Sequence, residues 1–514
     1  MVRFARPLAC LGLSFLLSLC LVLPLSAADD DSGDKGAPSS DQSQKPTTPP
    51  NPLPAAVTTE HTLQVSSTRT LHFKATAGAI RLSNAENGSP LADVSYVYYQ
   101  LEGADPEKRP VTFAVNGGPG AASAWLDLGA LGPWRIPMGG DGRRPDANPI
   151  PQPNAETWLD FTDLVFIDPP GTGYSRILSS DSGVKKNFYS VDGDINALSV
   201  VIRKWLDENK RIGSRKFIVG ESYGGFRAPK LAYRLEMHEG VGISGLLMLS
   251  PVLDFSTFDG DTNPMVFVTH LPSMTAAARN LSGNSGDPRE KLADVEAYAS
   301  GPYLVDIFKG ERDQQALARM SDQVAKFTGL DPALVRKLGG RIDVSTFVRE
   351  RDRASGKVDS VYDALTTGYD PYPHLAHGDF ADPILDVLRA PFASAMTYVT
   401  QKELNWFVDA RYEILNDDVN RDWDWGAHAP AEAVSDLRRI LALDPDLTVT
   451  IVHGVTDLVT PYFASKLAID QIPAMGNADR LELAVLAGGH MVYALDSSRA
   501  ALNALGNKMI DQRN

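Results

Sequence analysis

The sequence contains very little cysteine, since Cys10 and Cys20 are the only two among its 514 residues. Both lie in the first 28 residues. If that segment is removed, the rest of the chain has no pair of thiols for a disulfide and no thiol nucleophile. A chain of this length can bury enough apolar surface to be stable without disulfides.

The sequence also lacks a basic block, and its formal net charge is −15. This excludes the charge pattern typical of proteins that bind nucleic acid or anionic membranes. His374 and His377 are closely spaced among the nine histidines, but no set of carboxylates or thiolates completes a metal site around them. We therefore expect no metal site.

One long apolar run is present, Leu8–Leu25, and it follows two arginines. Ser26-Ala27-Ala28 then offers small residues for cleavage before Asp29, which is the pattern of an export signal. A retained membrane anchor is the alternative, although the run is barely long enough to span a bilayer. We expect residues 1–28 to be a signal peptide. The protein would then be exported, to the periplasm or outside the cell, with no stable membrane insertion after cleavage.

The remaining chain divides by composition. Residues 29–57 are rich in Asp, Ser and Pro, which predicts a disordered leader. Apolar strand-like runs alternate with helical patterns over 58–256 and again over 430–514, which predicts an α/β core with a mostly parallel sheet flanked by helices. Residues 257–429 are largely helical in pattern, and we expect them to form a cap insertion.

The stretch that organises the core follows a short apolar strand at Phe217–Val219. It reads Gly220-Glu221-Ser222-Tyr223-Gly224 and leads into a helix-like segment. Strand, G-x-S-x-G and helix in this order predict a nucleophile elbow, a sharp turn that exposes the serine at the sheet edge. The alternative is an ordinary glycine-rich turn with a surface serine.

A nucleophilic serine needs a base, and a carboxylate to orient that base. His490 follows a buried strand and two glycines late in the chain, and His453 is the second candidate. Asp457 is the only carboxylate on the loop after the preceding strand, although an Asx turn would also place an aspartate there. The order Ser222, Asp457, His490 is the order of an α/β-hydrolase triad.

Stabilising the reaction's oxyanion takes two backbone N–H groups. Tyr223 directly follows the serine and supplies one of them. The second is expected from the glycine loop Asn116–Gly120, where Gly118 is the candidate because Pro119 has no N–H. A plain β-turn is the alternative interpretation of this loop.

Five motifs in order, from NGGPG through DPPGTGYS, GESYGG and GxxD with a following proline to GGHMV, resemble the serine carboxypeptidase family. The resemblance implies an α/β-hydrolase fold, no cofactor, and release of C-terminal residues from peptides. It assigns Ser222, Asp457 and His490 to the triad and Gly118 with Tyr223 to the oxyanion hole. The chain matches these motifs loosely, and in this it resembles the bacterial members of the family more than the eukaryotic vacuolar ones.

The family also implies how a substrate's free C-terminal carboxylate is bound. Asn116 and Gly117 would donate hydrogen bonds to it, and a protonated Glu221 would donate another. A carboxyl group must be neutral to donate to a carboxylate, so binding should strengthen at acidic pH. A structural role for Glu221, as a buried carboxyl with its own partner, is the alternative.

Three positions depart from the family pattern. Ala114 replaces a frequent tryptophan, and Ala121 replaces a frequent cysteine. Ala130 stands where the family has a glutamate that shares hydrogen bonds with the one at position 221. The expected carboxylate-binding site therefore has fewer hydrogen-bonding groups, and the requirement for a free C-terminus is left open.

Other functions fit the same motifs. An esterase or acyltransferase uses the same triad, because the site and not the fold sets the substrate. A non-catalytic binding protein would keep the fold without needing all three triad residues. Proline iminopeptidases differ at position 116 and in the residue after the nucleophile.

Trp423 and Trp425 are interpreted as core residues, with a substrate pocket as the alternative. The oligomeric state stays open.

Overall fold

The computed structural model describes residues 51–136, 146–147, 149–258, 262–281, 286–375, 378–426 and 430–511. The expected signal peptide at 1–28, the leader up to residue 50 and His377 lie outside these ranges. Within them, no helix is both long enough and apolar enough to cross a bilayer.

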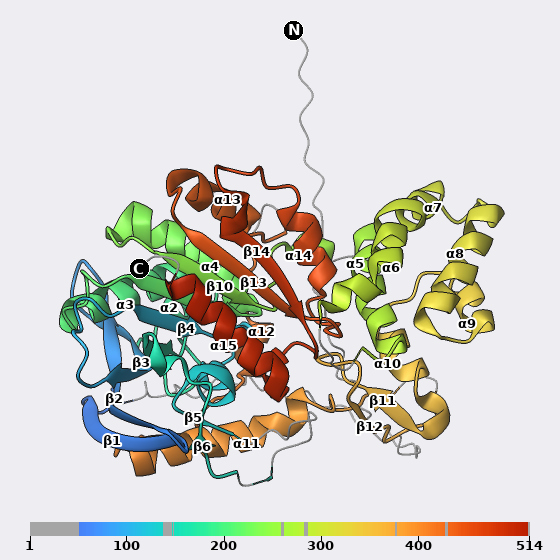
Figure 1. The fold of residues 1–514 in the computed structure, drawn as a ribbon. Helices are drawn as coiled ribbons and strands as arrows, with labels where there is room; N and C mark the ends of the chain where they lie inside the picture. Colours follow the sequence, from blue (N-terminus) through green and yellow to red (C-terminus); the bar gives the residue numbers. More distant parts are fainter. Residues whose placement is uncertain are drawn as a thin grey trace, which may run out of the picture. The chain divides into compact units, whose positions relative to one another are not determined.

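The core is built on one ten-stranded sheet (Figure 1). Its path runs in the order β1-β2-β3-β7-β4-β9-β10-β13-β14, and β8 pairs with β3 off this path. The first part is an antiparallel meander that joins β7 antiparallel. Its strands are β1 (Val57–Ser66), β2 (Arg69–Ser83), β3 (Pro90–Leu101) and the short β8 (Arg176–Ile177).

The remaining six strands are parallel, as the sequence predicts. They are β4 (Val111–Val115), β7 (Asp163–Ile167), β9 (Lys216–Glu221), β10 (Gly245–Leu249), β13 (Thr448–Gly454) and β14 (Leu481–Leu486). β4, β7, β9 and β10 are buried along their whole length, which explains why their central residues are mostly apolar. Because the strands are parallel, the loops that leave their carboxyl ends meet at one edge.

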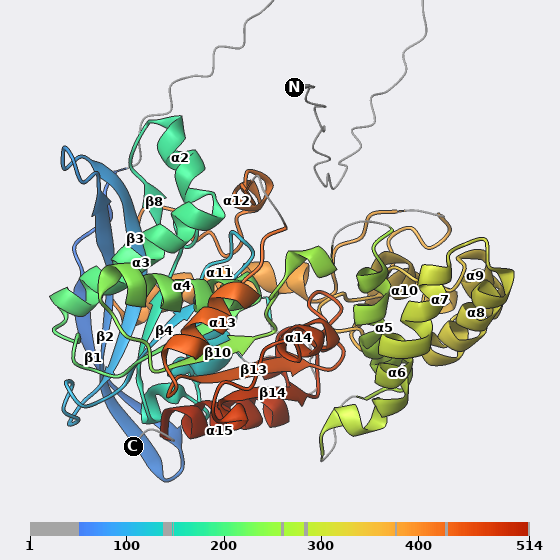
Figure 2. The ribbon, with the colours of Figure 1, turned by 90° about the horizontal axis from the view of Figure 1, so that it is seen from above.

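Helices cover both faces of this sheet. Successive residues of a strand point to opposite faces, and Ile218 and Phe217 accordingly belong to two different apolar clusters. Figure 2 shows α3, α4 and α13 on one side of the strands and α15 on the other. The helices of the core are α1 (Ala124–Leu126), α2 (Ser182–Phe188), α3 (Val191–Glu208), α4 (Tyr223–Arg234), α13 (Val434–Leu443), α14 (Tyr462–Ile469) and α15 (Asp496–Asp511).

The expected cap at residues 257–429 is largely helical, but its packing divides it. The apolar side chains of the first part form a separate cluster together with side chains of α14. Its elements are α5 (Pro264–Ala278), α6 (Ala293–Tyr298), α7 (Leu304–Lys309), α8 (Gln314–Thr328), α9 (Pro332–Lys337), α10 (Val344–Glu350), β11 (Lys357–Asp359) and β12 (Thr367–Tyr369).

The second part of the insertion packs into the core of the sheet. It contains α11 (Leu385–Tyr398) and α12 (Asp417–Arg421). Leu388, Phe392 and Met396 repeat every four residues, so they form one apolar helix face. The Phe392 ring lies 4.5 Å from the ring of Trp125. This part is therefore integral to the α/β core.

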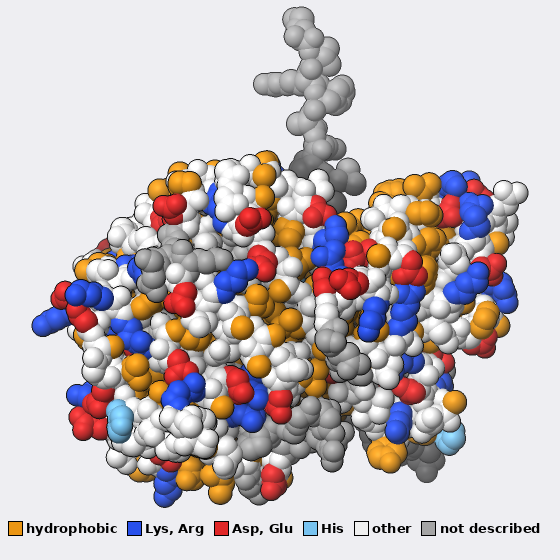
Figure 3. All heavy atoms as spheres, viewed as in Figure 1, with side chains coloured by type: hydrophobic (Ala, Val, Ile, Leu, Met, Phe, Trp, Pro, Cys, Tyr) orange, Lys and Arg blue, Asp and Glu red, His pale blue; other side chains and the backbone are white. Residues whose placement is uncertain are grey.

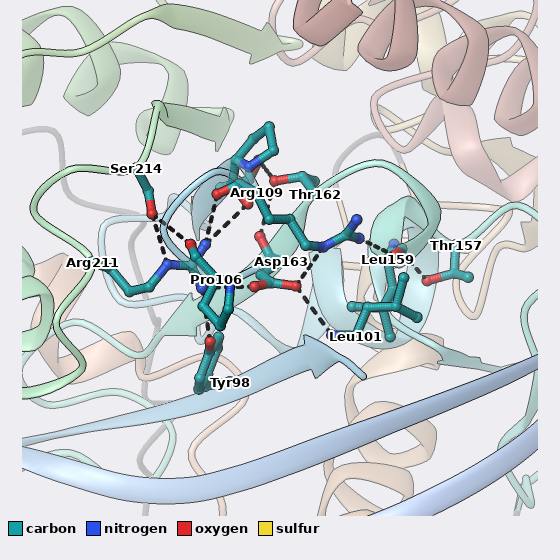
Figure 4. A network of polar contacts seen from close by, with 12 residues as sticks. Tyr98, Leu101, Pro106, Arg109, Thr157, Leu159, Thr162, Asp163, Arg211 and Ser214 are labelled. Carbon is teal, nitrogen blue, oxygen red and sulfur yellow. Dashed lines mark hydrogen bonds and ion pairs between the residues drawn. The ribbon is translucent and has the colours of Figure 1, made fainter. Parts of the chain in front are cut away.

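A buried ionic network holds the opposite, amino-terminal edge of the sheet (Figure 4). Asp163 at the start of β7 accepts hydrogen bonds from Arg109 Nε and Arg211 Nη1, both at 2.7 Å, and from the Leu101 N–H at 3.1 Å. Arg211 also donates to the Tyr98 hydroxyl. Since both carboxylate oxygens are occupied by protein donors, we assign this network a structural role.

Charged side chains of both signs are spread over the face that Figure 3 shows, interspersed with apolar ones.

Candidate active site

Ser222 sits on a strained turn between β9 and α4. Its φ is 60° and its ψ is −122°, a conformation that side chains other than glycine rarely adopt. A Cβ at Gly220 would lie 2.0 Å from the Gly224 carbonyl oxygen, and one at Gly224 would lie 2.2 Å from the Val115 carbonyl oxygen. Both glycines are therefore required for this turn, as the G-x-S-x-G motif predicts.

Asp457 and His490 form a buried pair. The carboxylate Oδ2 of Asp457 accepts a hydrogen bond from His490 Nδ1 at 2.9 Å. Its Oδ1 accepts the backbone N–H groups of Val459 and Thr460, and the Thr460 hydroxyl donates to Oδ2 at 2.7 Å. A carboxylate with these contacts holds the imidazole with its proton on Nδ1, which leaves Nε2 as the basic nitrogen.

The charge of this pair changes the basicity of the histidine. Burial lowers the pKa of His490, but the neighbouring Asp457 carboxylate and its hydrogen bond outweigh burial and raise that pKa above its ordinary value. An imidazolium formed at His490 is thereby stabilised, which is what a base that accepts a proton from serine requires.

The end of β10 connects the three loops that carry these residues. The Ser222 N–H donates to the Leu249 carbonyl at 2.9 Å. The Ser250 hydroxyl donates to the His490 carbonyl, and the Ser250 carbonyl oxygen lies 2.9 Å from the Thr460 hydroxyl, which shares its single proton between this carbonyl and Asp457 Oδ2. Ser222, Asp457 and His490 thus share one sheet edge and one hydrogen-bonded support.

The second histidine candidate, His453, has a different environment. It is fully buried, and its Nε2 lies 2.8 Å from the Ser465 hydroxyl of α14. Burial lowers the pKa of His453 to about 4. A histidine held neutral between β13 and α14 is a packing residue.

The glycine loop lies directly on the elbow. A Cβ at Gly117 would be 2.5 Å from the Tyr223 nitrogen and 3.0 Å from the Gly224 nitrogen. Gly118 has a φ of +98°, which favours glycine. Within the described part of the chain, neither the Gly118 N–H nor the Tyr223 N–H donates a hydrogen bond. One free donor directly follows the serine and the other lies in the loop that packs on the elbow, which is the pair of donors that an oxyanion hole needs.

A buried ion pair that no sequence motif predicts supports the glycine loop. Arg227 of α4 and Asp194 of α3 are each 1% exposed, and Arg227 Nε lies 2.6 Å from Asp194 Oδ2. The guanidinium also donates to the carbonyl of Asn116 and, at 3.5 Å, to that of Gly117. These contacts hold the loop through its carbonyl groups and leave the Gly118 N–H without a competing acceptor among the described residues.

Glu221 is 3% exposed and lies next to Ser222 in the chain. Its Oε2 accepts hydrogen bonds from Asn116 Nδ2 at 2.5 Å and from the Tyr493 hydroxyl at 3.2 Å, whereas its Oε1 has no partner among the described residues. Burial raises the pKa of Glu221 to about 7, although nearby His490 and the two donors act to lower it. The carboxyl therefore changes its charge near neutral pH.

The insertion contributes a residue to this site that the motifs do not reveal. The Tyr362 carbonyl accepts the His490 N–H at 2.6 Å, and the Tyr362 ring stands edge-on to the imidazole at 5.2 Å. The Leu458 N–H donates to the Val361 carbonyl, next to Asp457. The segment 361–364 therefore supports both the acid loop and the histidine loop.

The two tryptophans differ in exposure. Trp423 is 7% exposed and packs edge-on against Tyr223 at 5.5 Å, so it is a core residue as expected. Trp425 is 37% exposed and lies 5.7 Å from the Tyr223 ring. This places one partly exposed aromatic side chain beside the elbow. No group of three or more potential metal ligands occurs among the residues that the model describes.

Comparison with known proteins supports the resemblance. Residues 67–268 match the model of a family described as serine carboxypeptidase. Over 181 residues the chain is 30% identical to the pheromone-processing carboxypeptidase kex1 of Schizosaccharomyces pombe, which covers 34% of this chain and 32% of that protein. Over 186 residues it is 28% identical to serine carboxypeptidase-like 45 of Arabidopsis thaliana, covering 34% and 36%.

The sequence matches span about a third of the length of these relatives, and Asp457 and His490 lie outside the family match. The expectation of a bacterial-type member is not borne out, since these relatives come from a fungus and a plant.

A solved structure extends the comparison to most of the chain. The crystal structure of Kex1(delta)p, a prohormone-processing carboxypeptidase from Saccharomyces cerevisiae, aligns with a TM-score of 0.53 and 15% identity, covering 86% of this chain and 92% of that one. This confirms the predicted α/β-hydrolase fold. The family model and the sequence relatives confirm the motif resemblance as well: over residues 67–268 the chain is related to the serine carboxypeptidase family.

Proposed function

We propose that the protein is a serine carboxypeptidase that removes C-terminal residues from peptides through an acyl-enzyme on Ser222. The observation that carries this proposal is the buried Asp457–His490 pair, which shares the sheet edge and its support with a serine held on a strained turn. The family relationship supports the same chemistry.

In the proposed reaction, Ser222 Oγ attacks the scissile carbonyl carbon and its proton passes to His490 Nε2. Asp457 stabilises the resulting imidazolium. The N–H groups of Gly118 and Tyr223 donate to the oxyanion of the tetrahedral intermediate. The C–N bond then breaks, and His490 returns the proton to the leaving amine. Water attacks the acyl-enzyme by the same route and releases Ser222.

The proposed preference for a free C-terminus depends on Glu221. Below about pH 7 its carboxyl is neutral and can donate to a substrate carboxylate together with Asn116 and Gly117. Above that pH two carboxylates would face each other. We therefore propose an exopeptidase whose substrate binding weakens in mildly alkaline solution.

We also propose that the protein is exported, on the basis of residues 1–28. Expression of the full chain in its host, followed by N-terminal sequencing of the product, tests this directly. The expected mature N-terminus is Asp29. Recovery of a chain that begins at Met1 would contradict export by cleavage.

The activity is tested with an N-blocked dipeptide that has a free C-terminus, together with its ester analogue. The expected result is release of the C-terminal residue by the wild type and none by Ser222→Ala. Cleavage of the ester without any cleavage of the peptide would instead indicate an esterase on the same triad. Failure of a fluorophosphonate probe to label Ser222 would indicate a binding protein that keeps the fold.

A further inference from the structure

The buried Glu221 carboxyl needs a hydrogen-bond partner, and this chain lacks the second glutamate that the family pattern places beside it. Position 130 is a buried alanine on the turn η1 (Asp127–Leu131), so no second carboxyl reaches Glu221 from there. Glu221 is nevertheless fully enclosed, and a buried carboxyl without partners is costly. The side chain that takes this place determines how Glu221 is oriented and when it is charged.

That side chain is Tyr493. It is fully buried on the short turn η10 (Val492–Ala494), three residues after His490, and its hydroxyl donates to Glu221 Oε2 at 3.2 Å. A Cβ at Gly129 would lie 2.5 Å from Tyr493 Cε2. The ring therefore occupies the space beside position 129, and it fits there because residue 129 is glycine. Arg499 Nη1 donates to the Tyr493 carbonyl and fixes the turn.

The arrangement of donors decides which oxygen of Glu221 can carry a proton. Asn116 Nδ2 and the Tyr493 hydroxyl both donate to Oε2. A carboxyl oxygen that accepts two hydrogen bonds has its lone pairs occupied, so the proton of the neutral acid is placed on Oε1. Oε1 is the oxygen without a partner in the described structure, and it is free to donate to a bound anion.

A phenol also differs from a second carboxyl in its titration. Two carboxyl groups in contact share protons and titrate as a coupled pair. Burial raises the pKa of Tyr493 well above its ordinary value, so the hydroxyl stays a donor from pH 4 to 8. The other ionisable groups that act on Glu221 are His490, whose positive charge favours the carboxylate, and Asp457, whose negative charge opposes it.

We propose that Tyr493 is the positioning residue that replaces a second carboxyl in this chain: it fixes Glu221 through Oε2, so that Oε1–H is presented to the C-terminal carboxylate of a peptide. This inference rests on the proposed function and deepens it, because it assigns the substrate class to peptides with a free C-terminus despite the alanine at position 130.

Tyr493→Phe tests the proposal by removing only the hydroxyl. KM for an N-blocked dipeptide with a free C-terminus should rise severalfold at pH 5.5, whereas kcat/KM for its C-terminal amide should stay near the wild-type value. The pH at which KM begins to rise should move upward by about one unit, because a donor that stabilises the Glu221 carboxylate is lost. Tyr99→Phe is the matched control, since it removes another buried hydroxyl that donates to a carboxyl, that of Asp127.

A second measurement does not depend on peptide cleavage. Infrared titration of the Glu221 carboxyl in a Ser222→Ala background, with the band assigned by its loss in Glu221→Gln, should show the same upward shift for Tyr493→Phe. If Tyr493→Phe does not fold, Gly129→Ala displaces the ring and should give the same shift. Peptide cleavage with neither midpoint moved would overturn the role of Tyr493. The infrared shift, combined with a protein whose intact Ser222 cleaves no peptide, would instead overturn the proposed function.

Discussion

At the scale of single residues, burial sets the protonation of the groups around Ser222. Glu221 and His490 are both buried, and their pKa values are both raised, the first by burial and the second by Asp457 in spite of burial. Glu221 is needed neutral and His490 is needed as a free base. A low pH protonates His490 and a high pH ionises Glu221, so activity on substrates with a free C-terminal carboxylate should have a narrow pH range.

Glu221→Gln should remove the alkaline side of that range. Glutamine keeps an N–H donor at every pH, whereas wild-type Glu221 loses its proton as the pH rises through about 7. We expect KM of the wild type for the free-acid dipeptide to rise about tenfold per pH unit above that point, and KM of the variant to stay level. The measurement is KM between pH 5 and 8.5, with the C-terminal amide as control. An equal rise in both proteins would contradict the role of Glu221.

Asp457→Asn should lower kcat by about ten-thousandfold, since the imidazole loses both its orientation and the stabilisation of its positive form. Burial would then act on His490 without a neighbouring carboxylate, so its pKa should fall and the acid limb of kcat/KM should move to lower pH. Asp446→Asn, an exposed carboxylate after α13, is the control. A loss of less than tenfold with an unmoved limb would show that Asp457 only caps its own loop.

At the scale of elements, the insertion is part of the catalytic support. The segment 361–364 contacts the loops after β13 and β14, through Leu458, Thr456 and His490. The contact is close at Gly489, where a Cβ would lie 2.0 Å from the Tyr362 carbonyl oxygen. The position of His490 therefore depends on a segment more than a hundred residues away in the chain.

Gly489→Ala should separate these two segments and lower kcat by at least tenfold, with a parallel loss in the rate of fluorophosphonate labelling. The expected loss follows from the sensitivity of proton transfer to small displacements of the base. Gly213→Ala is the matched control, because its Cβ would meet nothing within 4 Å. Wild-type labelling by Gly489→Ala would show that the insertion does not position His490.

The sequence predicted the parts of this site that depend on local geometry. The elbow at Ser222 and the close approach of Gly117 require glycines at fixed spacings, and such requirements are visible in a motif. Tyr493, Tyr362 and the Arg227–Asp194 pair were not predicted, because they act through contacts between distant segments. The division of the insertion near residue 385 was not predicted for the same reason. The sequence of an apolar helix face does not show which part of the fold the helix packs against.

At the scale of the whole molecule, the same buried groups couple folding to pH. Folded Glu221 has a pKa of about 7, above its ordinary 4.5. Its stabilising effect is fully present below pH 4.5 and is lost as the pH rises through 7. His453 acts in the opposite direction, because its lowered pKa of about 4 costs stability below pH 6.5. Above pH 6.5 the losses from groups whose pKa is raised by folding remain, and Glu221 and His490 are two of them.

We therefore expect the free energy of unfolding to fall between pH 6.5 and 8, with Glu221 contributing about 1 kcal/mol of that loss. Urea denaturation at several pH values measures it, and Glu221→Gln should show a flatter dependence over the same window. A free energy of unfolding that rises from pH 6.5 to 8 would contradict a buried, proton-retaining Glu221.

We propose that Ser222 belongs to a carboxypeptidase site that recognises a free C-terminus. The most direct measurement is the ratio of kcat/KM for an N-blocked dipeptide to that for its C-terminal amide at pH 5.5. We expect a ratio well above ten for the wild type, and no cleavage of either substrate by Ser222→Ala. Equal cleavage of the two substrates, or cleavage that survives in Ser222→Ala, would contradict it.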